Sequence, residues 1–88
     1  MSAKAIVRQE IEKIPGVTRT WFEWSYEDNG AKANTLVVEV GFDTDPNSTN
    51  WDEQCLIDIQ KIAVDVLKNK TAMIVSYLRV VPAGIFTA

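Results

Sequence analysis

The sequence predicts a small α+β domain, a two-layer sandwich in which two helices cover one face of a three-stranded, mainly antiparallel sheet. Apolar residues recur at helical spacing in two stretches, and three stretches rich in β-branched and aromatic residues complete the order α-β-β-α-β. The composition, 47% hydrophobic and 24% charged over 88 residues, is that of a folded domain. We therefore assign residues 1–88 to a single domain.

The first helix is predicted over Ala3–Ile14. Ser2 precedes it as an N-cap, and Pro15 with Gly16 ends it, because proline cannot continue a helix and glycine suits the exit turn. The apolar face of this helix consists of Ala3, Val7, Ile11 and Ile14.

Two strands are predicted next, over Val17–Glu27 and Thr35–Phe42. Asp28, Asn29 and Gly30 supply turn chemistry between them, since Asn and Gly tolerate positive φ. The two strands therefore form an antiparallel hairpin.

The second helix is predicted from Asn50, with Glu53 completing a capping arrangement, to about Lys68. Its apolar stripe is Cys55, Leu56, Ile59, Ile62, Ala63, Val66 and Leu67. The third strand is predicted over Thr71–Val81, where Pro82 closes it.

The hairpin register decides which residues face the helices. An odd loop pairs Phe22 with Val38 and Trp24 with Leu36, and it gathers the apolar residues on one face, whereas an even loop divides them between faces. Burial favours the odd loop. The predicted core face is Phe22, Trp24, Leu36, Val38, Val40, Ile74, Leu78 and Val80.

The opposite face, which two helices leave uncovered, is rich in aromatic and charged residues. Its candidate interface or ligand-binding residues are Arg19, Trp21, Glu23, Val37, Glu39, Val75, Tyr77 and Arg79. An apolar centre with aromatic residues, arginine and a charged rim is typical of a protein interface. A second interpretation is that the segment Ala83–Phe86 folds back and covers this face.

Glu23 and Glu39 share the uncovered face and could act as an acid–base pair. In the predicted register Glu39 stands opposite Trp21 and diagonal to Arg19. We favour charge pairing with the arginines over acid–base chemistry.

The chain contains no histidine, which excludes His-based catalytic triads and the commonest zinc ligand. Cys55 therefore has no imidazole to activate it, and its place on the helical stripe indicates a core residue. We assign no catalytic residue.

The loop Asp43–Asn47 imitates the start of an EF-hand calcium loop. Ser48 stands where that loop needs glycine, and Gln54 stands where it needs glutamate. Asp52 and Glu53 bring two more carboxylates near. We interpret the region as a solvated loop before a helix N-terminus, and we predict no metal ligand and no cofactor.

The net charge of −3 and the scattered lysines and arginines argue against nucleic acid as a partner. No apolar stretch approaches the length of a membrane helix, so no membrane partner is predicted. A single cysteine and an early charged N-terminal stretch predict a cytoplasmic location.

The turn Ile14-Pro15-Gly16-Val17, the strand Leu36–Val40 and the order of elements resemble the cytoplasmic C-terminal domain of cation diffusion facilitator transporters. The resemblance implies a ferredoxin-like, metallochaperone-like unit that dimerises. Because this chain lacks the histidines on which that family's metal sites draw, no metal-binding residue is carried over.

We expect a non-enzymatic module that self-associates as a homodimer, or binds another protein, through the uncovered face. The alternative is a small-molecule-binding or enzymatic domain that uses the same face as a pocket wall.

Overall fold

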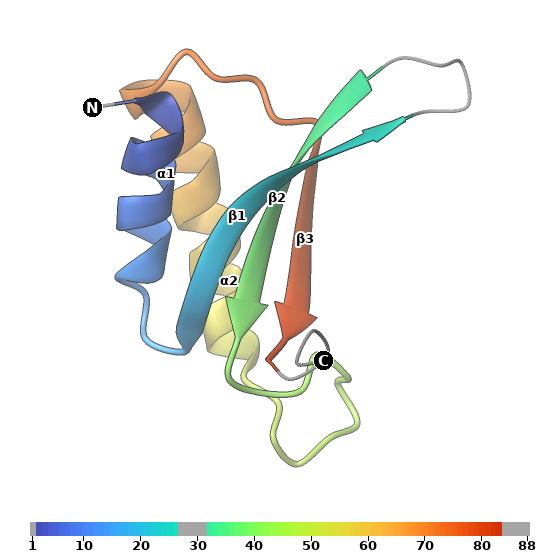
Figure 1. Cartoon of the computed structure of the whole chain (residues 1–88). Helices are drawn as coiled ribbons and strands as arrows, with labels where there is room; N and C mark the ends of the chain where they lie inside the picture. Colours follow the sequence, from blue (N-terminus) through green and yellow to red (C-terminus); the bar gives the residue numbers. More distant parts are fainter. Residues whose placement is uncertain (1, 27–31, 84–88) are drawn as a thin grey trace.

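The computed structural model describes residues 2–26 and 32–83, and its elements follow the predicted order α-β-β-α-β (Figure 1). The elements are α1 (Ala3–Glu12), β1 (Val17–Tyr26), β2 (Lys32–Val40), α2 (Glu53–Asp65), the π-helical turn η1 (Val66–Lys70) and β3 (Tyr77–Pro82). The predicted turn at residues 28–30 lies outside the described residues.

Helix α1 begins as predicted, because the Ser2 side chain accepts a hydrogen bond from the backbone N–H of Ala5 at 3.2 Å. The helix ends two residues earlier than predicted, and the next residues form turns in which the Ile14 N–H donates to the Ile11 carbonyl. Gly16 then reverses the chain at φ 101°, a conformation that L side chains rarely adopt.

Helix α2 begins at Glu53, and the expected cap at Asn50 is wrong. The N-cap is Asp52, whose Oδ1 accepts from the Cys55 N–H at 3.0 Å. A carboxylate in this position satisfies a free N–H and also interacts favourably with the helix dipole. At its other end the helix continues through η1 to Lys70, two residues beyond the predicted Lys68.

Strands β1 and β2 form the predicted antiparallel hairpin, but the register differs by two residues. Phe22 pairs with Leu36 and Trp24 pairs with Asn34. Because side chains alternate with a period of two, a shift of two residues leaves every side chain on its predicted face. The predicted faces of the hairpin are therefore retained, although the predicted partners are wrong.

The sheet is mixed, with the order β1-β2-β3, because β3 pairs with β2 in the parallel direction. Strand β3 begins at Tyr77, six residues later than predicted. Residues 71–76 instead connect the end of the helical layer to the sheet, and the Ser76 N–H donates to the Asn34 carbonyl at 2.9 Å.

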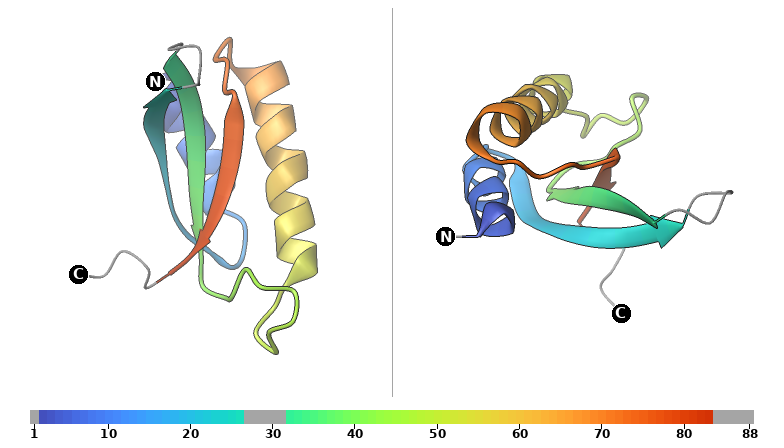
Figure 2. Two further views of the ribbon diagram at one scale, coloured as in Figure 1. Left: turned by 90° about the vertical axis from the view of Figure 1, so that its right-hand side faces the viewer. Right: turned by 90° about the horizontal axis from the view of Figure 1, so that it is seen from above.

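Both helices lie on one face of the sheet, as predicted (Figures 1 and 2). The buried core between the layers consists of Val7, Ile11, Ile14, Leu36, Val38, Val40, Phe42, Cys55, Ile59, Ala63 and Val66. Phe22 and Val80, both predicted to face the core, are partly buried against it. Among the described residues, no helix is long and apolar enough to cross a membrane.

Three residues assigned to the core are exposed instead: Trp24 at 56%, Ile74 at 83% and Leu78. Element length explains Trp24. The 10 residues of α1 span about 15 Å, whereas the 10 residues of β1 span about 33 Å, so β1 extends past α1. Figure 1 shows this projecting end. Ile74 is exposed because it lies in the connection before β3 rather than in the strand.

Candidate functional site on the helix-free face of the sheet

On the face of the sheet opposite the helices, three rows that cross all three strands hold nine side chains, and we call this set of nine the open face. The rows, each ordered β1, β2, β3, are Arg19–Glu39–Val81, Trp21–Val37–Arg79 and Glu23–Thr35–Tyr77. Strand pairing fixes these rows, because directly paired residues place their side chains on the same side of the sheet.

The central strand is buried on this face although no helix covers it. Val37 has no exposed surface and Thr35 is also buried, as is Val81 on the adjacent strand β3. In the row of Val37, its neighbours on the two edge strands are Trp21 and Arg79. The alternative cover, the segment Ala83–Phe86, lies outside the described residues beyond Ala83. Val37, which was predicted to belong to the apolar centre of this face, is therefore not accessible to solvent.

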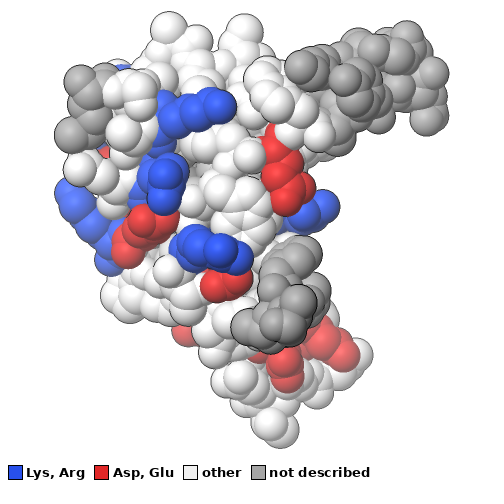
Figure 3. Space-filling view, in the orientation of Figure 1, with Lys and Arg blue, Asp and Glu red and all other residues white. Residues whose placement is uncertain are grey.

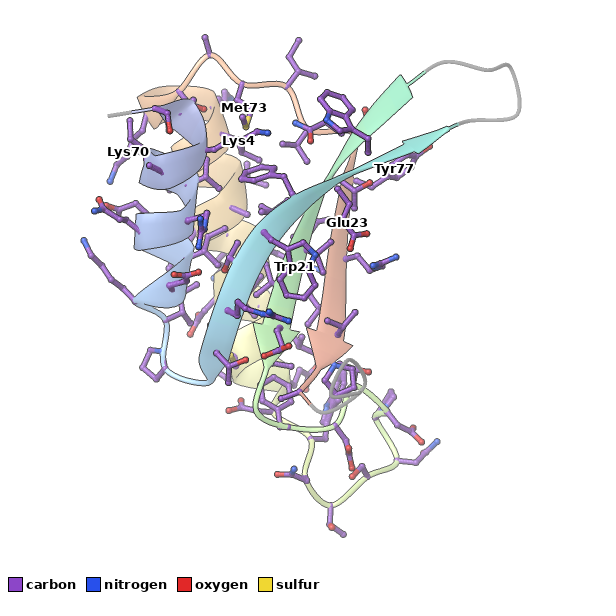
Figure 4. The ribbon with its side chains drawn as sticks, in the orientation of Figure 1. Lys4, Trp21, Glu23, Lys70, Met73 and Tyr77 are labelled. Carbon is purple, nitrogen blue, oxygen red and sulfur yellow. The ribbon has the colours of Figure 1, made fainter. Side chains whose placement is uncertain are left out.

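Trp21 is held in one orientation over the sheet. Its Nε1–H donates to Glu23 Oε1 at 2.9 Å, and the guanidinium carbon of Arg19 lies 4.4 Å from the ring centroid. The first contact satisfies the only polar group of the indole, and the second is a cation–π contact on the ring face. Figure 4 shows the Trp21 side chain lying across β2, with Glu23 beside it.

Glu23 also binds Arg79, which comes from the opposite edge of the sheet. Arg79 Nη2 donates to Glu23 Oε2 at 3.0 Å, so the pair crosses the central strand between β1 and β3. Each oxygen of this carboxylate therefore accepts one hydrogen bond, the first from Trp21 and the second from Arg79.

Glu39 organises the other end of the open face. Arg19 Nη2 donates to Glu39 Oε2 at 3.2 Å, and Thr18 Oγ1 donates to Glu39 Oε1 at 2.6 Å. Glu39 stands opposite Arg19, so its predicted place opposite Trp21 is wrong. Both glutamates are thus used in charge pairing with an arginine, which was the favoured interpretation.

The structure brings together seven of the eight predicted face residues, namely Arg19, Trp21, Glu23, Val37, Glu39, Tyr77 and Arg79. The exception is Val75, which precedes β3 and packs against the core cluster. Thr35 and Val81 were missed, although strand alternation from Val37 and Arg79 was sufficient to find them. Thr18 was missed because the sequence contains no signal for its contact with Glu39.

Basic and acidic side chains are interspersed on this side of the molecule rather than separated into patches (Figure 3). Arg19 and Glu39 pair, as do Arg79 and Glu23, so the charges of the open face sum to zero. A balanced face of this kind does not repel a second copy of itself.

The carboxylates of the acidic loop form hydrogen bonds within the loop itself. In the acidic loop, Asp43 Oδ2 accepts from Ser48 Oγ at 2.6 Å, and Asp45 Oδ1 accepts from the Asn47 N–H at 2.9 Å. Across residues 2–26 and 32–83, no group of three or more His, Cys, Asp or Glu side chains is arranged to hold a metal ion.

Cys55 is a core residue, as predicted, and is 4% exposed. Its Sγ donates to the Pro15 carbonyl at 3.3 Å. Burial, followed by the nearby charges of Asp52 and Asp58, raises the pKa of the Cys55 thiol above its ordinary value. The thiol is therefore held protonated, which is unsuited to a nucleophile.

A scan against protein-family models finds no match to this chain, and a search of curated proteins finds none.

Proposed function

We propose that this chain is a non-enzymatic protein-interaction module that self-associates as a homodimer through the open face. The observation that supports the proposal is the fixed position of Trp21, which is hydrogen-bonded to Glu23, stacked on Arg19 and still partly exposed. Tyr77, at 52% exposed, lies on the same face in the adjacent row.

The residue types support this function. Interfaces are enriched in Trp, Tyr and Arg, and a small number of such residues usually provides most of the binding free energy. Val37 and Val75 are excluded as anchors, because Val37 is fully buried and Val75 packs against the core. Trp21 and Tyr77 therefore take that role.

Preorganisation supports it further. Binding costs free energy when a side chain must be immobilised, typically about 0.5–1.5 kcal/mol for each flexible side chain. Arg19, Glu23 and Arg79 already hold one another or Trp21 in place within the monomer. Part of the entropy loss of immobilising these side chains therefore occurs during folding and not during association.

The charge arrangement favours a second copy over a strongly charged partner. Each copy presents two arginines and two glutamates on this face. In a twofold dimer the same face meets itself, so an arginine of one copy can approach a glutamate of the other. Dimerisation is also what the resemblance to the transporter C-terminal domains implies, and a cytoplasmic location remains part of the proposal.

Sedimentation velocity at tens of micromolar protein tests the proposal. We expect the wild type to sediment as a dimer and Tyr77→Asp as a monomer, because the substitution places an unpaired carboxylate in the interface. Val64→Asp is the matched control, since Val64 is 63% exposed on α2, and it should remain dimeric.

A wild type that stays monomeric over this range would overturn the proposal. A dimer that survives Tyr77→Asp would place the interface elsewhere on the molecule. The ligand-binding or enzymatic alternative requires a cavity beside Trp21 and Tyr77, and the groove between α1 and α2 is lined by neither residue.

A further inference from the structure

A groove lies between the two helices, on the layer of the molecule that the proposed dimer does not use. Its cavity volume is about 310 Å³, which is at the lower end of the range for small-molecule sites. Residues from α1, from the turn that follows it, from α2 and from the start of η1 line the groove.

The floor of the groove is apolar. Ile14 and Val66 line it from the two sides and are otherwise buried, and Ile62 adds a partly buried side chain. Such a floor favours a ligand with hydrocarbon surface, because contact removes apolar area from water.

On the α1 side, the charges of the rim are already paired. Glu10 interacts with Lys13 at 3.4 Å and with Lys70 at 3.5 Å. These two ammonium groups hold the pKa of Glu10 below its ordinary value, so its carboxylate is compensated within the chain.

On the α2 side, two carboxylates accept hydrogen bonds from neutral amide donors. Asp58 Oδ1 accepts from Gln54 Nε2 at 3.0 Å, and Asp65 Oδ1 accepts from Asn69 Nδ2 at 2.7 Å. In the part of the chain that the structure describes, neither aspartate forms an ion pair with a lysine or arginine. The groove therefore keeps two negative charges beside an apolar floor.

The spacing of these charges restricts the ligand. Asp58 and Asp65 are seven residues apart on α2, so they lie about two turns or 10.5 Å apart along the helix. Both line the groove, and Ile62 lies between them on the same side. An extended chain of about eight methylenes has a similar length to these two turns.

We propose that the interhelical groove binds an aliphatic diamine, with one ammonium group at Asp58, the other at Asp65 and the alkyl chain on Ile62, Ile14 and Val66. The proposal is independent of self-association, because the groove shares no residue with the open face. Lys61 lies within one turn of both aspartates and weakens the site by its positive charge.

Titration of isotope-labelled protein with diaminooctane, followed by amide NMR shifts, tests the site. We expect saturable shifts around Asp58, Ile62 and Asp65. Octylamine, with one ammonium group, should bind about threefold to fivefold more weakly, as expected for loss of one exposed ion pair. Octanediol should give no saturable shifts in this region, because it has the chain without the charges.

Amide variants identify the groups that bind. Asp58→Asn and Asp65→Asn should each weaken diaminooctane binding about threefold to fivefold, and Lys61→Gln should strengthen it. Glu53→Gln removes the same charge from the first turn of α2, outside the groove, and should leave the affinity unchanged. The wild-type spectrum in the absence of ligand should be retained in all four variants, which checks folding.

Three results would overturn the proposal: no saturable shift with diaminooctane, equal binding of octanediol, or an unchanged affinity in the Asp58→Asn, Asp65→Asn double variant. None of these results bears on the dimer, which sedimentation measures separately.

Discussion

Glu23 and Arg79 meet at 3.0 Å across the central strand of the sheet, although they belong to its two opposite edge strands. Adjacent strands lie about 4.8 Å apart and the two residues stand in neighbouring rows. The pair therefore spans about 10 Å across the sheet and about 7 Å along the strands. Side chains as long as Glu and Arg can bridge this distance. The pair therefore links the two edge strands on the face where Val37 of β2 has no exposed surface.

The first prediction concerns this pair. In a double-mutant cycle with Glu23→Gln and Arg79→Gln, we expect a coupling free energy of at most about 1 kcal/mol, because both side chains are partly solvated. Urea denaturation in low and high salt measures it, and the coupling should decrease in high salt. A coupling that is absent in low salt would contradict the pairing.

Val37 provides the second prediction. Val37→Thr places a hydroxyl group beneath the open-face side chains and should lower the free energy of unfolding by about 1–3 kcal/mol. The control Val64→Thr makes the same change at an exposed site and should change it by less than about 0.5 kcal/mol. Equal effects in urea denaturation would show that solvent reaches Val37 on the helix-free face.

The sequence was sufficient to predict the elements and the faces of the hairpin. Helical spacing identified the core residues of α1 and α2, and the preference for burying one face determined which strand residues point toward the helices. The hairpin register was predicted incorrectly by two residues, because burial distinguishes odd from even shifts but not one odd loop from another.

Other features depend on lengths and paths that local patterns do not encode. Met73, Ile74 and Val75 have strong strand propensity, yet this segment must carry the chain from the helices to the sheet. Trp24 is exposed because β1 is longer than α1. The contact of Glu23 with Arg79 joins residues 56 positions apart. Composition therefore indicated which residues share the open face, but not which of them bind one another.

The start of α2 supplies the third prediction, with a matched pair of substitutions. Asp52→Ala should lower the free energy of unfolding by about 1 kcal/mol, because the N-cap bond to the Cys55 N–H is lost. Asn50→Ala should cost less than about 0.5 kcal/mol, since its backbone carbonyl, and not its side chain, accepts from Asp43. If urea denaturation shows a larger loss of unfolding free energy for Asn50→Ala than for Asp52→Ala, the N-cap is Asn50, as the sequence predicted.

The turn after α1 supplies the fourth prediction. Gly16→Ala should lower the free energy of unfolding by about 1–3 kcal/mol, because φ is 101° and the new Cβ would lie 3.0 Å from Cys55 Sγ. Gly41→Ala is the control, since its nearest contact, at 3.7 Å from Thr18, is ordinary and its φ is not positive. Thermal melts compare the two variants, and an equal shift in melting temperature would argue against strain at Gly16.

The fifth prediction concerns the pH dependence that Cys55 imposes on stability. Burial raises the pKa of its thiol in the folded protein, so folding favours the protonated form. In the unfolded chain the thiol ionises near its ordinary pKa of about 8.5, and the unfolded state therefore binds fewer protons above that pH. The free energy of unfolding should then fall as pH rises from about 8 to 9.5.

The variant Cys55→Ala tests the source of this pH dependence. It lowers stability at every pH by leaving a cavity, but it should remove the part of the slope that the thiol causes, and urea denaturation across the pH range measures both effects. A slope that Cys55→Ala leaves unchanged would mean that other groups control stability in this range.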